Sequence, residues 1–312
     1  MEHEFTMSMS DGHQVFLKKW HPEGQDAKAV MQLSHGMAEH IGRYQPFAEF
    51  LANHGFIVYG NDHRGHGKTG QQSGNTGFLA DHDGFERVVD DMHEINGLIH
   101  GEFPNVPVFL LGHSMGSFLA RRYVQRFHGR VQGVILTGTA GSPGFPGRVG
   151  KILAQSQVRK LGKLAPSEKM NQLMFGNYNK SFANVRTPFD WLSRDHREVD
   201  KYVNDPLCGF VCSSGFYVDL LTGLFAIHRD SEISKIEKEL PFLFLSGSDD
   251  PVGHRTKGVQ QAVQQLQRRG ITNVEVKFYD GARHELFQET NRDEVFQEIY
   301  QWLEQQLKFG TI

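Results

Sequence analysis

Short, uninterrupted apolar runs alternate with amphipathic helical patterns through the first half of the chain. The apolar runs lie at residues 29–33, 56–59, 108–111 and 131–137. The helical patterns that follow the first three runs lie at residues 44–54, 84–100 and 117–127. A strand that is apolar on both sides is typical of a parallel sheet covered by helices on both faces. The alternation therefore predicts an α/β fold with a doubly wound, mostly parallel sheet.

Two strand-like segments precede this alternation, at residues 4–9 and 14–20. The Asp11-Gly12 turn signal between them predicts an N-terminal hairpin. Near the C-terminus the alternation resumes, with strands expected at 241–246 and 274–279 and helices at 252–269 and 289–307.

Between residues 142 and 236 the alternation stops. This stretch has no clear strand, several turn signals and many aromatic residues. A segment of this length and apolar content must bury its side chains, so it is not a disordered linker. We expect a helical cap, or lid, at 142–236, inserted into a core formed by residues 1–141 and 237–312.

The segment 106–116 (VPVFLLGHSMG) combines a strand, a tight turn and the start of a helix. Its last five residues place Ser114 between Gly112 and Gly116 in a Gly-x-Ser-x-Gly pattern. A serine that points out of a strand-to-helix turn needs a strained backbone, and the glycines remove side chains that would collide there. This context predicts a nucleophile elbow with Ser114 as the catalytic nucleophile.

A nucleophilic serine needs a base, and the base needs a carboxylate that orients it. In this architecture the acid and the histidine follow the serine, in loops after later strands. The loop after 241–246 supplies Asp249 and Asp250, and the loop after 274–279 supplies His284, the expected base. We favour Asp250 as the acid because Pro251 restricts its backbone to an extended conformation, and Asp249 stays the alternative.

The loop after the run 29–33 is expected to complete this site. Gly36 allows a close approach of the backbone, so the amide of Met37 can face the same space as the amide of Met115. Two such amides would form an oxyanion hole, which stabilises the negative oxygen of a tetrahedral intermediate. The residues expected to support these loops are His35, Gly36, Glu39, His40 and His113. Glu39 and His40 could instead be merely solvated.

A second cluster, at residues 62–67 (DHRGHG), holds two histidines and an aspartate within five residues. The spacing matches no helix-based zinc pattern, and the glycines are typical of a tight structural loop. We therefore expect no metal ion, and the chemistry expected at Ser114 requires no cofactor.

The overall composition of the chain excludes several classes of function. A formal net charge of −3 offers no basic surface for nucleic acid. No apolar run approaches the roughly 20 residues that span a bilayer, and the N-terminus lacks the features of a secretory signal. Cys208 and Cys212 are expected to be reduced structural thiols, at a spacing that suits one face of a helix. These features indicate a soluble, cytoplasmic protein.

Taken together, the motifs resemble those of the α/β-hydrolase superfamily, and more narrowly its monoacylglycerol lipase and lysophospholipase branch, the serine aminopeptidase-like hydrolases. They are HG-x-x-EH at 35–40, DHRGHG at 62–67, GHSMG at 112–116, G-x-x-D at 247–250 and His284. The resemblance covers nearly the whole chain and departs in the cap, which is longer than in compact bacterial members. It implies the α/β-hydrolase fold, a Ser114–His284–Asp250 triad, oxyanion donors at Met37 and Met115, and a mobile cap over an acyl-chain pocket.

The resulting hypothesis is hydrolysis of a small lipid ester, a monoacylglycerol or a lysophospholipid, through an acyl-enzyme on Ser114. His284 has to be neutral to accept the serine proton, so activity should fall as the pH drops through about 6.5. The aromatic cap favours an apolar acyl group. An exposed apolar cap could touch a membrane surface transiently or mediate dimers, and the sequence leaves the oligomeric state open.

Two other functions stay open at this point. The first is an aminopeptidase or amidase of the same fold, which would bind a free amine through acidic groups of the cap. The candidates are Asp195, Glu198, Asp200 and Asp205. The second is a non-catalytic binding protein on a hydrolase fold, which labelling of Ser114 by an active-site phosphonate would test.

Overall fold

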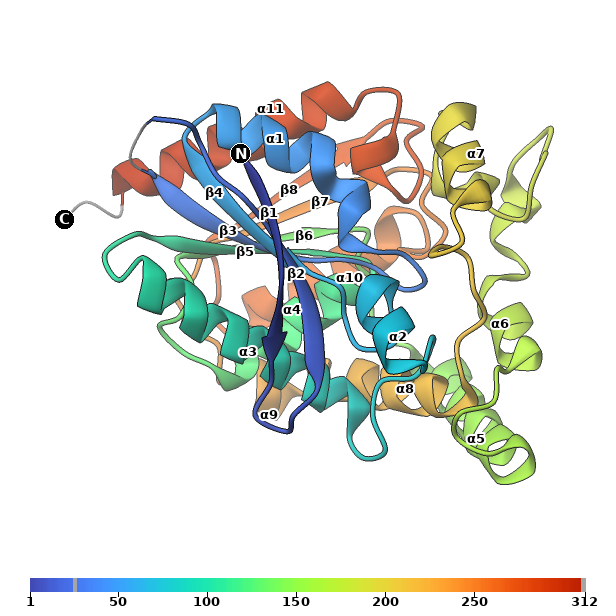
Figure 1. Ribbon diagram of the computed structural model, residues 1–312. Helices are drawn as coiled ribbons and strands as arrows, with labels where there is room; N and C mark the ends of the chain where they lie inside the picture. Colours follow the sequence, from blue (N-terminus) through green and yellow to red (C-terminus); the bar gives the residue numbers. More distant parts are fainter. Residues whose placement is uncertain (25–26, 310–312) are drawn as a thin grey trace.

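The computed structural model describes residues 1–24 and 27–309 of the chain. The strands in this part form one eight-stranded sheet in the order β1-β2-β4-β3-β5-β6-β7-β8 (Figure 1). The strands are β1 (Glu2–Ser8), β2 (Gln14–Trp20), β3 (Ala29–Ser34), β4 (Phe56–Asn61), β5 (Val108–His113), β6 (Gly133–Thr137), β7 (Phe242–Gly247) and β8 (Val274–Tyr279). Strands β3 to β7 are buried along their whole length, as uninterrupted apolar runs require.

The pairing of the strands confirms the mostly parallel sheet and the N-terminal hairpin. β1 pairs with β2 and β2 with β4 in antiparallel fashion, and every pair from β4 to β8 is parallel. The chain runs from β3 outward to β4 and then crosses back to β5 on the other side of β3. The strand order therefore reverses between the carboxyl ends of β3 and β5, the place where open α/β sheets bind their ligands.

Helices cover both faces of the sheet (Figure 1). On one face, α1 (Gln45–Asn53) and α11 (Arg292–Phe309) pack aromatic residues such as Phe47 and Trp302 against the strands. The second apolar cluster includes side chains of α3 (Gly84–Glu102), α4 (Met115–Arg126), α8 (Ser214–Ile227) and α10 (Thr256–Arg268). The predicted alternation of strand and helix is thus confirmed on both sides of the segment 142–236.

Residues 142–236 contain helices and loops, and within the described residues no strand is assigned there. The helices are α5 (Gly144–Leu161), α6 (Glu168–Phe175), α7 (His196–Asn204), α8 and α9 (Asp230–Ile233), with 3-10 turns η2 (Tyr178–Ser181) and η3 (Asp190–Leu192). Figure 1 shows α5, α6 and α7 at one end of the molecule, whereas α8 contacts α3 and α4. The division into a core and a movable cap stays a prediction.

Two local expectations are wrong. A short helix, α2 (Gly67–Ser73), forms where the sequence indicated only a loop. Cys208 and Cys212 are free thiols, but they lie in the loop between α7 and α8 rather than on one helix face. Pro206 explains the difference, because the residue before a proline avoids helical geometry and α7 ends at Asn204. Within the described residues, no helix has the length and apolar character needed to cross a bilayer.

Candidate active site

Ser114 lies in the tight turn between β5 and α4, and its backbone is strained. Its φ of 52° and ψ of −118° fall in a region that residues with side chains rarely adopt. A Cβ atom at Gly112 would collide with the carbonyl oxygen of Gly116, and one at Gly116 would collide with that of Ser34. Both glycines are therefore required by the packing of this turn, as the motif predicted.

His284 and Asp250 lie in the loops after β8 and β7. His284 Nδ1 donates a hydrogen bond to Asp250 Oδ2 at 2.9 Å, and both side chains are buried. The other carboxylate oxygen, Asp250 Oδ1, accepts the backbone N–H of Val252 at 2.9 Å. Asp249 remains partly exposed. Of the two adjacent acids, Asp250 is the one that contacts His284, and this bond leaves Nε2 of His284 available for proton transfer.

The surroundings of His284 favour its protonated form. Burial opposes the imidazolium, but the charge of Asp250 and its hydrogen bond outweigh burial and raise the pKa of His284 above 6.5. The adjacent His113 behaves in the opposite way, because burial and the proximity of His284 lower the pKa of His113 to about 3. His284 is therefore the better suited of the two to exchange a proton near neutral pH.

The loop after β3 is held in place by His35. Nε2 of His35 accepts the backbone N–H of His63 at 3.0 Å, so Nδ1 holds the proton and donates to the carbonyl of Gly36 at 2.7 Å. The C=O and N–H of a trans peptide point in opposite directions, so this bond turns the N–H of Met37 away from His35. A Cβ atom on Gly36 would lie 3.3 Å from Ser114 Cβ, which places this peptide beside the serine.

A cavity of about 590 Å³ opens at this edge of the sheet, and Ser114, His284, Met37 and Met115 all line it. Met115 is the first residue of α4, so its N–H has no acceptor within the helix. The apolar wall comes mainly from the segment 142–236 and includes Phe145, Val149, Leu153, Met170, Leu173, Met174, Phe175, Leu220, Leu221 and Leu224. The cavity can hold a long apolar group with a polar atom next to Ser114.

Arg43 joins the loop after β3 to the loop after β8, a link that the sequence did not predict. Its Nη1 donates to Glu39 Oε2 at 2.7 Å and to Glu285 Oε1 at 2.6 Å, and its Nη2 donates to Glu285 Oε2 at 2.7 Å. Glu39 Oε1 in turn accepts the backbone N–H of Gly36 at 2.6 Å. Burial alone would lower the pKa of Arg43, but the two carboxylates raise it. One guanidinium therefore connects the two loops, and Glu39 is hydrogen-bonded both to it and to the backbone of its own loop.

The segment 142–236 also contacts both loops. The ring of Trp191, in η3, lies 5.1 Å from the ring of His284 between centroids. The backbone N–H of Glu285 donates to the carbonyl of Leu192 at 2.7 Å, and Tyr202 Oη donates to the carbonyl of Ala38 at 2.9 Å. No sequence pattern marked these residues, because their partners lie far away along the chain.

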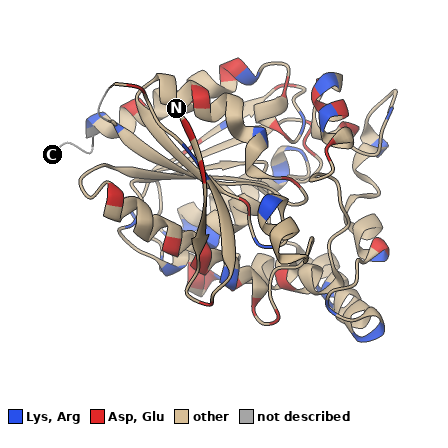
Figure 2. Cartoon of the chain, in the orientation of Figure 1, with Lys and Arg blue, Asp and Glu red and all other residues tan. Residues whose placement is uncertain are grey.

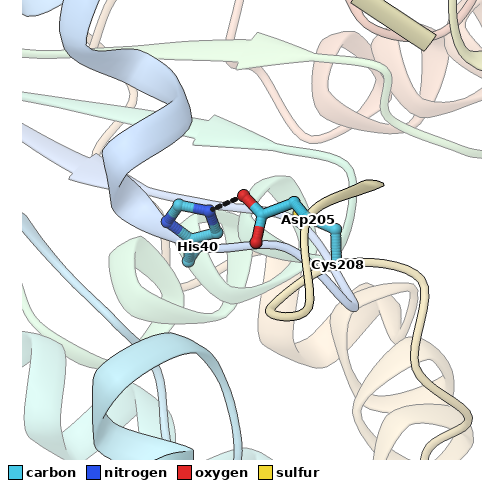
Figure 3. Close-up of side chains that lie close together, drawn as sticks. All are labelled: His40, Asp205 and Cys208. Atoms are coloured by element: carbon cyan, nitrogen blue, oxygen red, sulfur yellow. Dashed lines mark hydrogen bonds and ion pairs between the residues drawn. The ribbon is translucent and has the colours of Figure 1, made fainter. Parts of the chain in front are cut away.

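His40 contacts the loop after α7, as Figure 3 shows. Ligand atoms of His40, Asp205 and Cys208 lie within 4.8 Å of one another, the kind of grouping that can hold a metal ion. Here Nδ1 of His40 accepts the backbone N–H of Gly42 at 3.2 Å, so Nε2 carries the proton and donates to Asp205 Oδ2 at 2.9 Å. A metal ligand needs a lone pair on Nε2, and this arrangement uses that atom as a donor instead. His40 thus supports its loop through Asp205.

The cluster 62–67 forms a tight structural loop, as predicted. Asp62 accepts the backbone N–H groups of Ile41 at 2.8 Å and Lys68 at 2.6 Å. Nε2 of His63 is 2.9 Å from Ser34 Oγ, and Arg64 binds Asp91. These contacts anchor the loop beneath the residues that lead into the active site.

This chain is similar to known proteins over most of its length. The family model described as serine aminopeptidase, S33, matches residues 25–291. Monoglyceride lipase of Homo sapiens is 31% identical over 303 residues, which cover 95% of this chain and 88% of that protein. Monoacylglycerol lipase of Mycolicibacterium smegmatis is 28% identical, with 96% of each chain covered. The structure of a thermostable carboxyl esterase from Bacillus coagulans, in complex with glycerol, superposes with a TM-score of 0.90 at 27% identity, covering 98% of this chain and 99% of the esterase.

Proposed function

Since the chain belongs to the serine aminopeptidase S33 family of α/β-hydrolases and is a carboxylic ester hydrolase, we propose that it cleaves monoacyl lipids, monoacylglycerols or lysophospholipids, at Ser114. The observation that carries this proposal is the cavity, which places a mostly apolar wall next to Ser114 and the buried His284–Asp250 pair. An acyl chain can pack along the apolar wall while its ester carbonyl lies at the serine.

In the proposed reaction, Nε2 of His284 takes the proton of Ser114 Oγ as the oxygen attacks the ester carbonyl. Asp250 holds the imidazole in the required tautomer and stabilises the imidazolium. The backbone N–H groups of Met37 and Met115 bind the developing oxyanion. His284 then protonates the leaving alcohol, and water repeats the sequence on the acyl-enzyme to release the fatty acid.

The polar end of the cavity favours a neutral head group. Glu39 and Glu285 both line the cavity, and among the described residues Arg43 is the ion-pair partner of both, so these three side chains together carry a net negative charge. Carboxylate oxygens accept hydrogen bonds from the hydroxyl groups of glycerol but repel a phosphate. We therefore expect monoacylglycerol to be the better substrate of the two lipid classes.

An aminopeptidase is the second candidate, and the geometry gives it less support. The four acidic residues that could bind a free amine are Asp195, Glu198, Asp200 and Asp205. Asp195 caps α7, Glu198 and Asp200 form ion pairs with basic side chains, and Asp205 accepts a hydrogen bond from His40. Among the described residues that line the cavity, none of these four is found.

Turnover of a substrate panel tests the proposal. It comprises p-nitrophenyl esters of increasing chain length, a monoacylglycerol, lysophosphatidylcholine and an aminoacyl p-nitroanilide. We expect the monoacylglycerol to be hydrolysed fastest and the anilide to be left intact. Cleavage of the anilide alone would favour the aminopeptidase, and no cleavage of any substrate would favour a binding protein.

The pH dependence of kcat/KM should reflect the raised pKa of His284. Only neutral His284 can accept the serine proton, so a higher pKa moves the loss of activity on acidification to a higher pH. We expect the acid limb of the profile to have its midpoint above 6.5, measured with a soluble p-nitrophenyl ester. A profile that stays flat down to pH 5 would contradict the role of His284.

Gly36→Ala should impair the reaction without unfolding the protein. The added Cβ would lie 2.7 Å from Glu39 Oε1 and 3.3 Å from Ser114 Cβ, so the peptide that carries the Met37 N–H must shift. Loss of one oxyanion donor lowers kcat by about 10²-fold or more. Gly97→Ala is the matched control, because a Cβ there meets no atom within 4 Å. Unchanged kcat in Gly36→Ala would argue against Met37 as a donor.

A further inference from the structure

The turn η3 is bonded to the loop that carries His284 at two points, one on each side of Trp191. The carbonyl of Asp190, just before Trp191, accepts a hydrogen bond from Nη1 of Arg283. The carbonyl just after Trp191 accepts the backbone N–H of Glu285 at 2.7 Å. Arg283 and Glu285 are the two neighbours of His284 along the chain. Because the two stretches are joined on both sides, the indole of Trp191 is placed opposite the imidazole of His284, with 5.1 Å between the ring centroids.

Ion pairs continue this attachment beyond η3. Arg194 Nε donates to the buried Glu289 Oε2 at 2.9 Å, in the segment that follows the His284 loop. Figure 2 shows charged residues of both signs along α7, which begins two residues later. One of these, Glu198, pairs with Arg292 in the first turn of α11 at 3.3 Å. Residues 190–198 are therefore attached at several points to the part of the core that carries the histidine.

The indole of Trp191 is held by packing rather than by a hydrogen bond of its own. Its ring centroid lies 5.8 Å from that of Phe175 and 4.9 Å from that of Tyr178. Its Nε1–H is buried and has no hydrogen-bond partner among the described residues. A buried donor without a partner lowers the stability of a fold. A phenylalanine would keep an aromatic ring here without this cost, so stability does not account for the indole.

An indole is suited to a histidine that becomes positively charged during the reaction. In the proposed mechanism His284 gains a proton as Ser114 attacks the ester. The quadrupole of an aromatic ring stabilises a cation that lies within about 6 Å of its centroid, and the effect is strongest for Trp. Asp250 binds one edge of the imidazole through Nδ1, whereas the contact with Trp191 acts on the ring itself.

We propose that Trp191 is a positioning residue for the reaction: it holds the imidazole of His284 at one tilt toward Ser114 and stabilises the imidazolium that forms there. The role proposed for Trp191 rests on the proposed function, since it requires His284 to be the base. A substitution of Trp191 leaves the other titratable groups around His284 unchanged. These groups are Asp250, Glu285, Glu39, His113 and Tyr178.

Steady-state kinetics of Trp191→Leu with p-nitrophenyl acetate tests this role. Trp191 also lines the cavity, but an acetyl group is too short to depend on the apolar wall. We expect kcat on the alkaline plateau to fall about ten-fold and KM to change less than about three-fold. The acid limb of kcat/KM should move to lower pH, because the imidazolium loses part of its stabilisation.

Two further variants serve as controls. Trp191→Phe keeps an aromatic ring opposite His284 and should retain kcat within about three-fold. Trp302→Leu makes the same change as Trp191→Leu at another buried indole, which lies in α11 and contacts Phe109. The folded Trp302→Leu protein should keep the native kcat, since this position has no contact with the proposed site.

A histidine NMR titration without substrate separates this role from the proposed function. The Cε1–H resonance of His284 is identified by its loss in His284→Asn. Its titration midpoint should fall in Trp191→Leu and stay close to native in Trp191→Phe. Because the titration needs no turnover, it distinguishes a failure of the proposed function, seen as full activity in Ser114→Ala, from a failure of the role of Trp191.

The role of Trp191 would be overturned by any of three results: an unchanged kcat in Trp191→Leu, an unchanged titration midpoint in that variant, or an equal loss of kcat in Trp302→Leu. A rise in KM with native kcat would show that Trp191 serves only as part of the cavity wall.

Discussion

Ser114→Ala is expected to lower kcat for ester hydrolysis by about 10⁶-fold, since no other group in the proposed site can form the acyl-enzyme. Alanine retains the Cβ atom that the turn already accommodates, so the fold should persist. Hydrolysis of p-nitrophenyl butyrate measures the loss, and circular dichroism measures the melting temperature. We expect the melting temperature to change by less than about 3 °C, equivalent to less than about 1 kcal/mol.

A fluorophosphonate probe provides a check that does not depend on turnover. The native chain should be labelled at Ser114, and Ser114→Ala should take up no label. Labelling that persists in the variant would place the nucleophile at another residue. A folded variant that keeps most of its activity would remove the basis for the proposed mechanism.

Asp250→Asn is expected to lower kcat by about 10⁴-fold. The buried carboxylate accepts a hydrogen bond from His284 Nδ1 at 2.9 Å and so leaves Nε2 unprotonated toward the serine. An asparagine amide can donate to Nδ1 instead, which would move the proton to Nε2 and leave no lone pair for Ser114. Steady-state kinetics with a soluble ester measures the effect.

Asp249→Asn is the matched control for this substitution, because it makes the same chemical change one residue earlier, at a partly exposed side chain. It should retain activity within about three-fold, because Asp250 still holds His284 in this variant. Substitution of a partly exposed side chain also changes the stability of the fold little. If instead Asp249→Asn were the inactive variant, the assignment of the acid would be reversed. If both variants stayed active, His284 would not depend on either carboxylate.

The parts of this site that the sequence predicted are those that local geometry determines. The turn at Ser114 needs glycine on both sides because the backbone atoms of Gly116 and Ser34 come too close for a side chain. His284 and Asp250 were predictable because parallel strands bring their carboxyl ends to one edge of the sheet, so the loops after β7 and β8 must meet. Uninterrupted apolar runs predicted strands β3 to β7, because a strand that helices cover on both faces needs apolar residues along its whole length.

The parts that the sequence did not predict depend on contacts between distant residues. Arg43 and Glu285 are 242 positions apart, and no spacing along the chain indicates that they meet. The four-residue spacing of Glu39 and Arg43 was the only local signal of this network. The contact between Trp191 and His284 is equally hard to predict, since the two rings meet across 93 positions of the chain and no local pattern pairs them.

Release of glycerol and fatty acid from 1-oleoylglycerol, compared between the native chain and Ser114→Ala, is the measurement that decides whether this chain hydrolyses monoacylglycerols at Ser114. We expect rapid release of both products by the native chain, loss of that release in the folded variant, and no cleavage of an aminoacyl p-nitroanilide by either. Cleavage of the anilide by a native chain that leaves 1-oleoylglycerol intact would show that the protein is an amidase and not a monoacylglycerol lipase.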